Sequence, residues 1–281
     1  MNDIKNNIKL YNHDDKSLIT DWGVNSFPDG QNQPWIRGVE TFGDIDVHVR
    51  ITSPEILDVF LQLGRLLSTS AKEVHIKYLY GSRCDKDSYG KKTDTVLVSN
   101  TNRFIQEEIS RNFFMAKIKV LTPHGFCRFE EEFWYPPVLK TTAGQIGIFP
   151  DKSASFRNRL KVAASIVCEK ERDQSTGQII KFNLLDLDKL NLENGYVKNL
   201  WVLDDMCDGG ATFVKVAEAV KESPLKDIPL NLLVTHGIFS NGAVPRLINA
   251  GYNHIYCTNS YKDMKVLQET HKDHLTITEV F

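Results

Sequence analysis

The chain has 281 residues and a formal net charge of −2, with 41% hydrophobic and 25% charged residues. This length suits two domains, and the composition is that of an ordinary globular protein rather than a disordered or fibrous one. A charge so close to zero argues against binding through many backbone phosphates, so we expect no nucleic-acid partner.

The five cysteines are odd in number, widely spaced and without a CxxC pair. This pattern suits neither a disulfide framework nor a zinc site. The first residues, MNDIKNNIKLYNHDD, lack the apolar segment of a signal peptide. No run approaches the roughly 18 apolar residues of a membrane span. We therefore expect a cytoplasmic protein with reduced thiols and no membrane partner.

Apolar runs alternate with segments of helical period, which predicts βα units and mainly parallel sheets. In the first half, residues 54–71 place Ile56, Phe60, Leu63 and Leu67 on one helical stripe. A strand at 74–80, a helix at 102–113 and a strand at 117–124 follow. These elements predict an α/β domain over residues 1–145.

The pattern restarts near residue 145, which predicts a second domain over 146–281. Residues 170–183 are polar, and we expect them to form a mobile excursion that turns around 175–177. The other elements expected here are strands at 145–149, 165–169, 200–205, 231–237 and 254–259, and helices at 154–164, 211–221 and 244–250.

The stretch LWVLDDMCDGGAT (200–212) carries the most information. An apolar strand ends in Asp204 and Asp205, a loop with Gly209 and Gly210 follows, and a helix begins at 211 or 212. Free amides at the beginning of a helix favour a bound phosphate, and glycine lets the backbone approach it closely. Acidic side chains would repel a phosphate, so the two aspartates suit ribose hydroxyls or a metal ion.

This loop resembles the phosphoribosyl-binding loop, usually written DDxxDTxGT, of type I phosphoribosyltransferases and phosphoribosyl-pyrophosphate synthetases. A glycine loop by itself is as readily explained as a plain helix cap after a buried strand. The double aspartate with the full spacing favours the family. The resemblance implies a ribose-phosphate site formed by Asp204, Asp205, Asp208, Gly209, Gly210, Ala211 and Thr212.

Other segments resemble the synthetases in the same order along nearly the whole chain. FPDGQ (27–31) is similar to the FxDGE segment that helps to hold the ATP base. YGSRCDK (80–86) is similar to the YxRQDR segment that contacts ATP from a neighbouring subunit. With the histidine that ends the strand at 117–124, the resemblance implies an ATP site that includes Phe27, Asp29, Gln31, Arg83, Asp85 and His124.

Two further segments carry the catalytic groups of the family. KVLTPHGF (119–126) resembles a strand that ends in a metal-contacting histidine, and FPDKSASFR (149–157) resembles the PDxG segment. The resemblance therefore implies Mg²⁺ held near His124 and Asp151. CEKER (168–172) resembles the KRR start of the mobile catalytic loop, so the implied catalytic residues are Lys170, Arg172 and His124.

The resemblance implies two phosphoribosyltransferase-like α/β domains, each with a mainly parallel sheet flanked by helices. It implies a diphosphokinase that moves the β,γ-diphosphate of ATP to the anomeric hydroxyl of a ribose 5-phosphate unit and releases AMP. Because the family completes its ATP site across a subunit contact, a homodimer or larger homo-oligomer is expected. Each residue alone has an ordinary explanation as a turn, a surface cation or a strand-end histidine, but their agreement with one family outweighs this.

The chain also departs from the family pattern. Gln31 replaces a glutamate and Cys84 a glutamine, both where the nucleotide base should bind. Gly209 replaces a threonine and Ala211 a glycine in the phosphate loop. Losing that hydroxyl removes a donor suited to a terminal phosphate, and the paired glycines open space for an acceptor whose 5-phosphate is already esterified. ADP-ribose, used by viral NAD⁺ salvage enzymes that resemble these synthetases, and ribose 5-phosphate are therefore equal candidates.

Two other functions stay open on the sequence. A phosphoribosyltransferase would consume the activated sugar and would need neither Lys170 nor Arg172. A catalytically silent regulatory subunit of a synthetase should have lost its metal and loop residues, yet His124, Lys170 and Arg172 are all present.

Overall fold

The computed structural model describes residues 2–38, 41, 43–81, 101–139, 143–157, 162–172, 179–185, 187, 190 and 197–281. The chain divides into two compact units, Met1–Phe133 together with Phe281, and Trp134–Val280. The ranges 1–145 and 146–281 stay a prediction for the functional domains.

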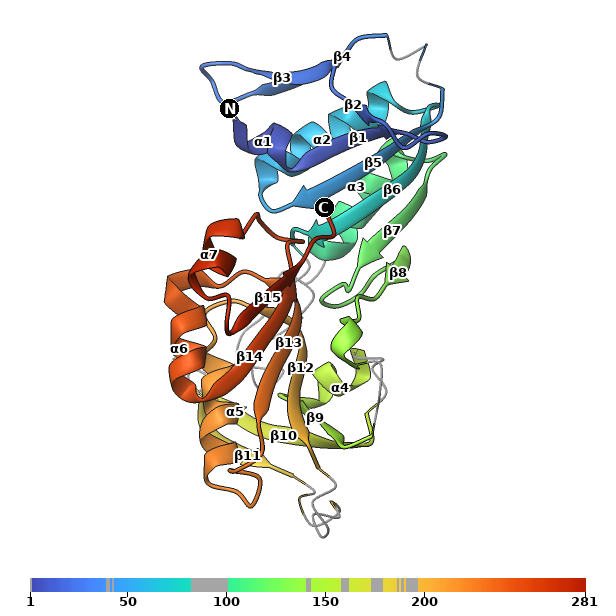
Figure 1. Ribbon diagram of the computed structural model, residues 1–281. Coiled ribbons are helices and arrows are strands. Elements are labelled where there is room, and N and C mark those ends of the chain that lie inside the picture. Colours follow the sequence, from blue (N-terminus) through green and yellow to red (C-terminus); the bar gives the residue numbers. More distant parts are fainter. Residues whose placement is uncertain are drawn as a thin grey trace. The chain divides into compact units, whose positions relative to one another are not determined.

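Unit 1 is built on a six-stranded sheet in the order β2-β1-β5-β6-β7-β8 (Figure 1). β1 runs antiparallel to β2 and β5, whereas β5, β6, β7 and β8 run parallel to one another. A separate antiparallel hairpin is formed by β3 and β4. The strands are β1 (Ile8–Asn12), β2 (Leu18–Ile19), β3 (Trp22–Ser26), β4 (Asn32–Ile36), β5 (Ile45–Ile51), β6 (Ala71–Leu79), β7 (Lys117–Leu121) and β8 (Glu130–Glu132), and the helices are α1 (Asn2–Asn6), α2 (Pro54–Leu66) and α3 (Thr101–Asn112).

The two faces of this sheet differ because side chains alternate along each strand. Val47 and Val49 of β5 are fully buried and share a core with Phe60 of α2 and Ile109 of α3. The intervening residues of β5 and β6 are polar. Helix α2 begins where the sequence predicts, at Pro54 after the cap Ser53, whose Oγ accepts a hydrogen bond from the amide of Ile56 at 3.4 Å.

Unit 2 holds a seven-stranded sheet in the order β11-β10-β9-β12-β13-β14-β15. All strands are parallel to their neighbours except β11, which pairs antiparallel with β10 at the edge. Its strands are β9 (Gln145–Phe149), β10 (Ala164–Arg172), β11 (Ile179–Leu184), β12 (Asn199–Cys207), β13 (Leu230–Gly237), β14 (Tyr252–Thr258) and β15 (Leu275–Thr278). Its helices are α4 (Lys152–Arg157), α5 (Ala211–Lys221), α6 (Ala243–Ala250) and α7 (Lys265–Thr270), with short 3-10 turns η2 (Pro137–Leu139) and η4 (Ser240–Gly242).

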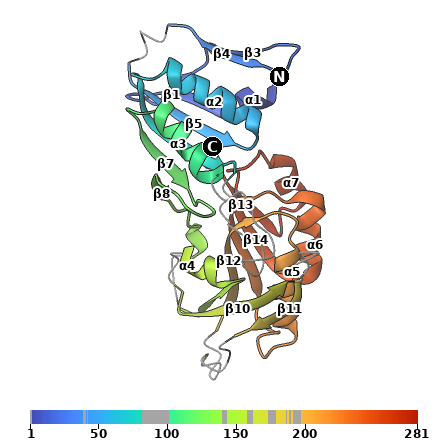
Figure 2. The ribbon, with the colours of Figure 1, turned by 180° about the vertical axis from the view of Figure 1, so that it is seen from behind.

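Helices cover both faces of the second sheet (Figures 1 and 2). α5 and α6 bury Phe213, Val216 and Leu247 in one core with residues of β12 and β13. On the opposite face, Ala154 of α4 packs in a smaller cluster with Trp201 and Leu203. Mainly parallel sheets with flanking helices confirm the predicted α/β class. In the described part of the chain, no helix is long and apolar enough to cross a membrane.

Some predicted elements differ from the structure. The helix expected at 154–164 cannot reach its predicted end, because Ala164 begins β10 and pairs with Ile146. β12 runs two residues beyond the predicted strand, since Met206 and Cys207 pair with His236 and Gly237. The segment at 170–183 is not merely a polar excursion: its described residues lie in a β-hairpin, where Lys170 pairs with Phe182.

Candidate functional site

The predicted phosphate loop lies between a central strand and a helix of unit 2. β12 is flanked by β9 and β13, and three residues separate the end of β12 from the beginning of α5. Gly210 is the N-cap of α5, with φ of 80° and no side-chain cap. This left-handed backbone suits glycine, and the first amides of an 11-residue helix lie beyond it. The loop therefore has the backbone geometry of an anion-binding site at the beginning of a helix.

Asp208 of this loop is held by a residue that the sequence did not single out. Ser240 Oγ donates a hydrogen bond to Asp208 Oδ1 at 2.6 Å. Ser240 lies in the turn between β13 and α6, where Phe239, Asn241 and Gly242 have φ of 47°, 51° and 69°. A left-handed non-glycine residue costs on the order of 1–3 kcal/mol, so the rest of the fold must enforce this turn.

The paired aspartates at the end of β12 are placed differently from each other. Asp205 is only 4% exposed, whereas Asp204 is half-buried and its Oδ1 accepts a hydrogen bond from the amide of Asp205 at 2.9 Å. The neighbouring Cys207 is buried, and burial raises the pKa of its thiol, so it is not an activated nucleophile.

Other predicted groups lie at the same edge of this sheet. Val202 of β12 pairs with Ile148 of β9, so Asp204 and Asp151 both lie beyond the last residue of β9. β10 pairs with β9 as far as Val167, and its last five residues pair with β11 alone. The backbone of Lys170 and Arg172 thus extends past the carboxyl edge, where open α/β sheets bind ligands.

Asp151 also has an evident structural task. Its Oδ1 accepts a hydrogen bond from the amide of Ala154 at 2.8 Å, which caps the beginning of α4. Carboxylate oxygen is nevertheless a donor type that Mg²⁺ prefers, and Mg²⁺ commonly uses one or two carboxylates together with substrate phosphates. Among the described residues, no group of three or more His, Cys, Asp or Glu could hold a metal ion by itself. Asp151 fits a magnesium ion that is bound mainly by phosphate.

The predicted ATP-base segment forms the tip of the β3–β4 hairpin in unit 1. Asp29 Oδ1 accepts a hydrogen bond from the amide of Gln31 at 3.0 Å, and Gly30 has φ of 86°. Phe27 is 48% exposed at this tip. The aspartate therefore shapes the turn, and the exposed ring is the group available for stacking on a base.

His124 follows β7 in unit 1 and is half-buried. Two residues before it, Thr122 has φ of 39°, and its amide donates a hydrogen bond to the carbonyl of Glu132 at 2.7 Å. A β-branched residue in this region is unusual and marks a turn fixed by its surroundings. The predicted residues Arg83 and Asp85 lie outside the described residues, as do the side chains of Lys170 and Arg172.

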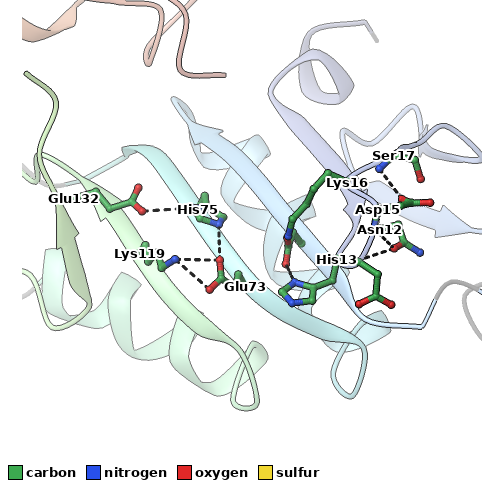
Figure 3. A network of polar contacts seen from close by, with 11 residues as sticks. Asn12, His13, Asp15, Lys16, Ser17, Glu73, His75, Lys119 and Glu132 are labelled. Atoms are coloured by element: carbon green, nitrogen blue, oxygen red, sulfur yellow. Dashed lines mark hydrogen bonds and ion pairs between the residues drawn. The ribbon is translucent and has the colours of Figure 1, made fainter. Parts of the chain in front are cut away.

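A polar network that the sequence analysis did not predict covers the second face of the unit 1 sheet (Figure 3). Glu73 of β6 accepts hydrogen bonds from Lys119 at 3.0 and 3.1 Å and lies 3.1 Å from Nε2 of His75. Glu132 of β8 lies 3.8 Å from Nδ1 of His75. The signal was present as a polar residue at every second position of β5 and β6.

The other half of this network is organised by the β1–β2 turn. Asn12 Oδ1 accepts hydrogen bonds from the amides of Asp14 and Asp15, which closes the turn. The turn brings His13 Nδ1 and Lys16 Nζ each to 2.7 Å from the carboxylate of Asp46. Burial raises the pKa of Asp46, but the bonds to Lys16 and His13 outweigh this and hold it below the ordinary value.

A hollow of about 450 Å³ lies over this face and is lined from both halves of the network. On its floor the His48 ring lies between Tyr11 and His75, with centroid distances of 4.9 and 4.5 Å. Burial, followed by the nearby charges of His75 and Lys77, lowers the pKa of His48 to about 3. His48 is therefore neutral at physiological pH.

Replacing Asp46 by asparagine is expected to lower the free energy of unfolding of unit 1 by about 2 kcal/mol, because Lys16 and His13 lose a buried charged acceptor. Urea unfolding at pH 7 measures the loss. Asp14→Asn in the same turn is the control and should change stability by less than about 0.5 kcal/mol, since that side chain is exposed. Equal losses in both variants would refute a special role for Asp46.

Comparisons with known proteins show which enzymes the chain resembles in sequence and in fold. No protein-family model matches the chain. The chain is 25% identical to a ribose-phosphate pyrophosphokinase of Sulfolobus acidocaldarius, over 90% of this chain and 87% of that protein. It is 32% identical to the corresponding enzyme of Pyrococcus abyssi, over 40% of this chain and 36% of that protein.

A solved structure supports the fold over nearly the whole chain. The phosphoribosylpyrophosphate synthetase from Mycobacterium smegmatis superposes with a TM-score of 0.67, at 17% identity, over 95% of this chain and 88% of that one. At this identity the likeness shows the fold alone. The chain is thus similar in sequence to ribose-phosphate pyrophosphokinases and similar in fold to a phosphoribosylpyrophosphate synthetase.

Proposed function

We propose that this chain is an ATP-dependent diphosphokinase that acts on the anomeric hydroxyl of a ribose 5-phosphate unit. The observation that carries the proposal is the carboxyl edge of the unit 2 sheet. There, the paired aspartates near the end of β12 and the amide-rich loop that opens α5 lie at the same sheet edge as the end of β10, which bears Lys170 and Arg172. The similarity to ribose-phosphate pyrophosphokinases supports the same reaction class.

In the proposed reaction, the anomeric oxygen forms a bond to the β-phosphorus of ATP. The bond from that phosphorus to the bridging oxygen of AMP breaks, AMP leaves, and the hydroxyl proton is released. Negative charge spreads over phosphate oxygens in such a transition state, so catalysis depends on positioning and on nearby cations. Lys170 would supply a point charge and Arg172 a two-pronged contact to those oxygens.

The remaining predicted residues have binding roles in this proposal. The loop amides and Thr212 hold the 5-phosphate, Asp204 and Asp205 orient the ribose hydroxyls, and Asp208 shapes the loop. Mg²⁺, when bound, neutralises phosphate charge, and Asp151 and His124 are its proposed protein partners. The proposed ATP contacts are Phe27, Asp29, Gln31, Arg83, Asp85 and His124. The proposed assembly is a homodimer or larger, and the acceptor is ribose 5-phosphate or ADP-ribose.

The test is incubation with ATP and Mg²⁺ plus either ribose 5-phosphate or ADP-ribose. We expect AMP and an acceptor that is heavier by one diphosphate, detected by mass spectrometry. Chelation of Mg²⁺ should abolish both products. If neither acceptor yields AMP, the chain is not a diphosphokinase of this kind, and a silent regulatory subunit becomes the better description.

A further inference from the structure

Two buried amide side chains on helix α3 have no role in the reaction proposed above. Asn102 and Gln106 lie one helical turn apart, and both are almost completely buried. Burying an amide costs free energy unless its polar atoms are hydrogen-bonded, so a helix that only covered the sheet would carry apolar side chains at these positions. Ile105 and Ile109 of the same helix do so and lie in the unit 1 core. The two amides therefore need a separate explanation.

Both amides bond to the backbone of the loop that follows His124. Gln106 Nε2 donates hydrogen bonds to the carbonyl of Phe126 and to Asn102 Oδ1, both at 2.8 Å. Gln106 Oε1 accepts a hydrogen bond from the amide of Arg128, also at 2.8 Å. Asn102 Nδ2 donates a second hydrogen bond to the carbonyl of Phe126, at 3.0 Å. Gln106 thus holds the loop at two backbone positions, and Asn102 supports it at one of them.

These bonds fix one end of a short segment whose other end is fixed by the sheet. The amide of Thr122 donates a hydrogen bond to the carbonyl of Glu132 in β8, at 2.7 Å. His124 lies between this anchor and the anchor on α3. It is followed by Gly125, whose φ of 146° lies in a region that favours glycine. The place of the histidine along the chain is therefore set from both sides.

Apolar packing contributes less to the part of the loop beside His124. The side chain of Phe126 is 48% exposed, and Cys127 and Phe129 are only partly buried where they pack against the unit 1 core. An apolar side chain in place of Gln106 would leave the amide of Arg128 without its acceptor, which is costly for a backbone group. The hydrogen bonds from α3 are thus the main restraint on this stretch of backbone.

We propose that Gln106, supported by Asn102, is a positioning residue that holds His124 in place for ATP and Mg²⁺. This inference rests on the proposed function and extends it to two residues that are assigned no contact with a substrate. It adds no step to the reaction. Because a displacement of a catalytic group by about 1 Å can cost a hundredfold in rate, a loop held by two buried amides is a sensitive point of the site.

The experiment is a double-mutant cycle between Gln106→Leu and His124→Ala, measured as kcat/KM for ATP at saturating Mg²⁺ and acceptor. Gln106→Leu alone should lower kcat/KM about thirtyfold, mainly through a higher KM for ATP. In a chain that already lacks the imidazole, the same change should lower it by less than about threefold, because the loop no longer has a histidine to position. The KM of the sugar acceptor should change by less than about twofold in each variant.

Asn112→Leu is the matched control. Asn112 is a buried amide at the end of the same helix, but it bonds to Arg65 and to the carbonyl of Glu108 rather than to the loop. The control should lower the melting temperature about as much as Gln106→Leu and leave the KM for ATP unchanged. If Gln106→Leu does not fold, Asn102→Ala takes its place in the cycle, with a smaller expected loss of about fivefold because one bond to the loop is removed instead of two.

Two further readouts do not depend on turnover. Hydrogen exchange of a peptide covering residues 122–130, without ligands, should be faster in Gln106→Leu than in the natural chain and unchanged in Asn112→Leu. The calorimetric affinity for ATP with Mg²⁺, without acceptor, should fall about tenfold in Gln106→Leu and less than about twofold once His124 is alanine.

The outcomes separate this inference from the proposed function. If Gln106→Leu causes equal losses with and without the imidazole, or leaves the affinity for ATP unaltered, Gln106 does not position His124 and the proposed function still stands. If the natural chain forms no AMP with either acceptor, the proposed function fails, and the calorimetric cycle alone decides whether Gln106 positions His124.

Discussion

Replacing Lys170 by alanine is expected to lower the rate of AMP formation about a thousandfold, equivalent to about 4 kcal/mol of transition-state stabilisation. The ammonium group is proposed to act on the migrating phosphates only as their charge redistributes. Its loss should therefore reduce kcat while changing the KM of the sugar acceptor little. Initial rates of AMP release at saturating ATP and Mg²⁺ measure the effect.

The matched control for this change is Lys181→Ala. Lys181 lies on β11 of the same hairpin and pairs with Glu171, so the variant removes a lysine of equal charge from the neighbouring strand. It should keep most of the activity. Similar rates for the Lys170 variant and the natural chain would show that Lys170 does not act on the phosphates. The phosphoribosyltransferase alternative, which needs no such cation, would then gain support.

Lowering the pH is expected to reduce the free energy of unfolding of unit 1 already at pH values above those at which carboxylates titrate. Burial first, and then the charges of His75 and Lys77, lower the pKa of His48 to about 3 in the folded state. In an unfolded chain it should titrate near about 6.5. Below that pH the unfolded state binds a proton that the folded state refuses, so stability falls as the pH drops from about 6.5 toward 3. Allowing for the partial exposure of His48 to solvent, the free energy of unfolding of unit 1 should fall by about 2 kcal/mol between pH 6.5 and 4.5.

Urea unfolding at a series of pH values, monitored by hydrogen exchange of peptides from β5 and β6, measures how the free energy of unfolding of unit 1 depends on pH. His48→Gln should remove most of this dependence between pH 6.5 and 4.5. The further loss at lower pH should stay, because Asp46, Glu73 and Glu132 have pKa values held below their ordinary ones. His254→Gln in unit 2 is the control and should leave the slope of unit 1 unchanged. An unaltered slope in the His48 variant would mean that another group takes up the proton.

Local signals in the sequence predicted the secondary structure around the site well. The α5 helix occupies 211–221 as expected, because an apolar stripe of Phe213, Val216 and Val220 follows a glycine at the N-cap. The α2 helix was predicted to reach residue 71 but ends at Leu66. The side chain of Leu67 still enters the core, while its backbone, with φ of −100° and ψ of 17°, has left the helix. Because Leu67 is buried, the apolar periodicity of the sequence continues beyond the last turn of the helix.

Contacts between distant residues could not be read from the sequence. The bond from Ser240 to Asp208 joins residues 32 positions apart. It depends on left-handed backbone at Phe239 and Asn241, and the phenylalanine gives no indication of this conformation in the sequence. The pairing of His48 with His75 likewise depends on the register between β5 and β6, which shifts on either side of it. The order of motifs indicated a resemblance to a family, but only coordinates show which side chains share a partner.

Strand β10 is hydrogen-bonded to the parallel sheet of unit 2 along only part of its length. Residues 164–167 are tied into the parallel sheet, whereas residues 168–172 are bonded to β11 alone. Cys168 at the junction between these two parts is buried in the unit 2 core, and Phe182 and Leu184 of β11 pack against the same core. A movement that spares the core is therefore expected only beyond the pair of Lys170 and Phe182, toward the end of the β10–β11 hairpin that carries Arg172.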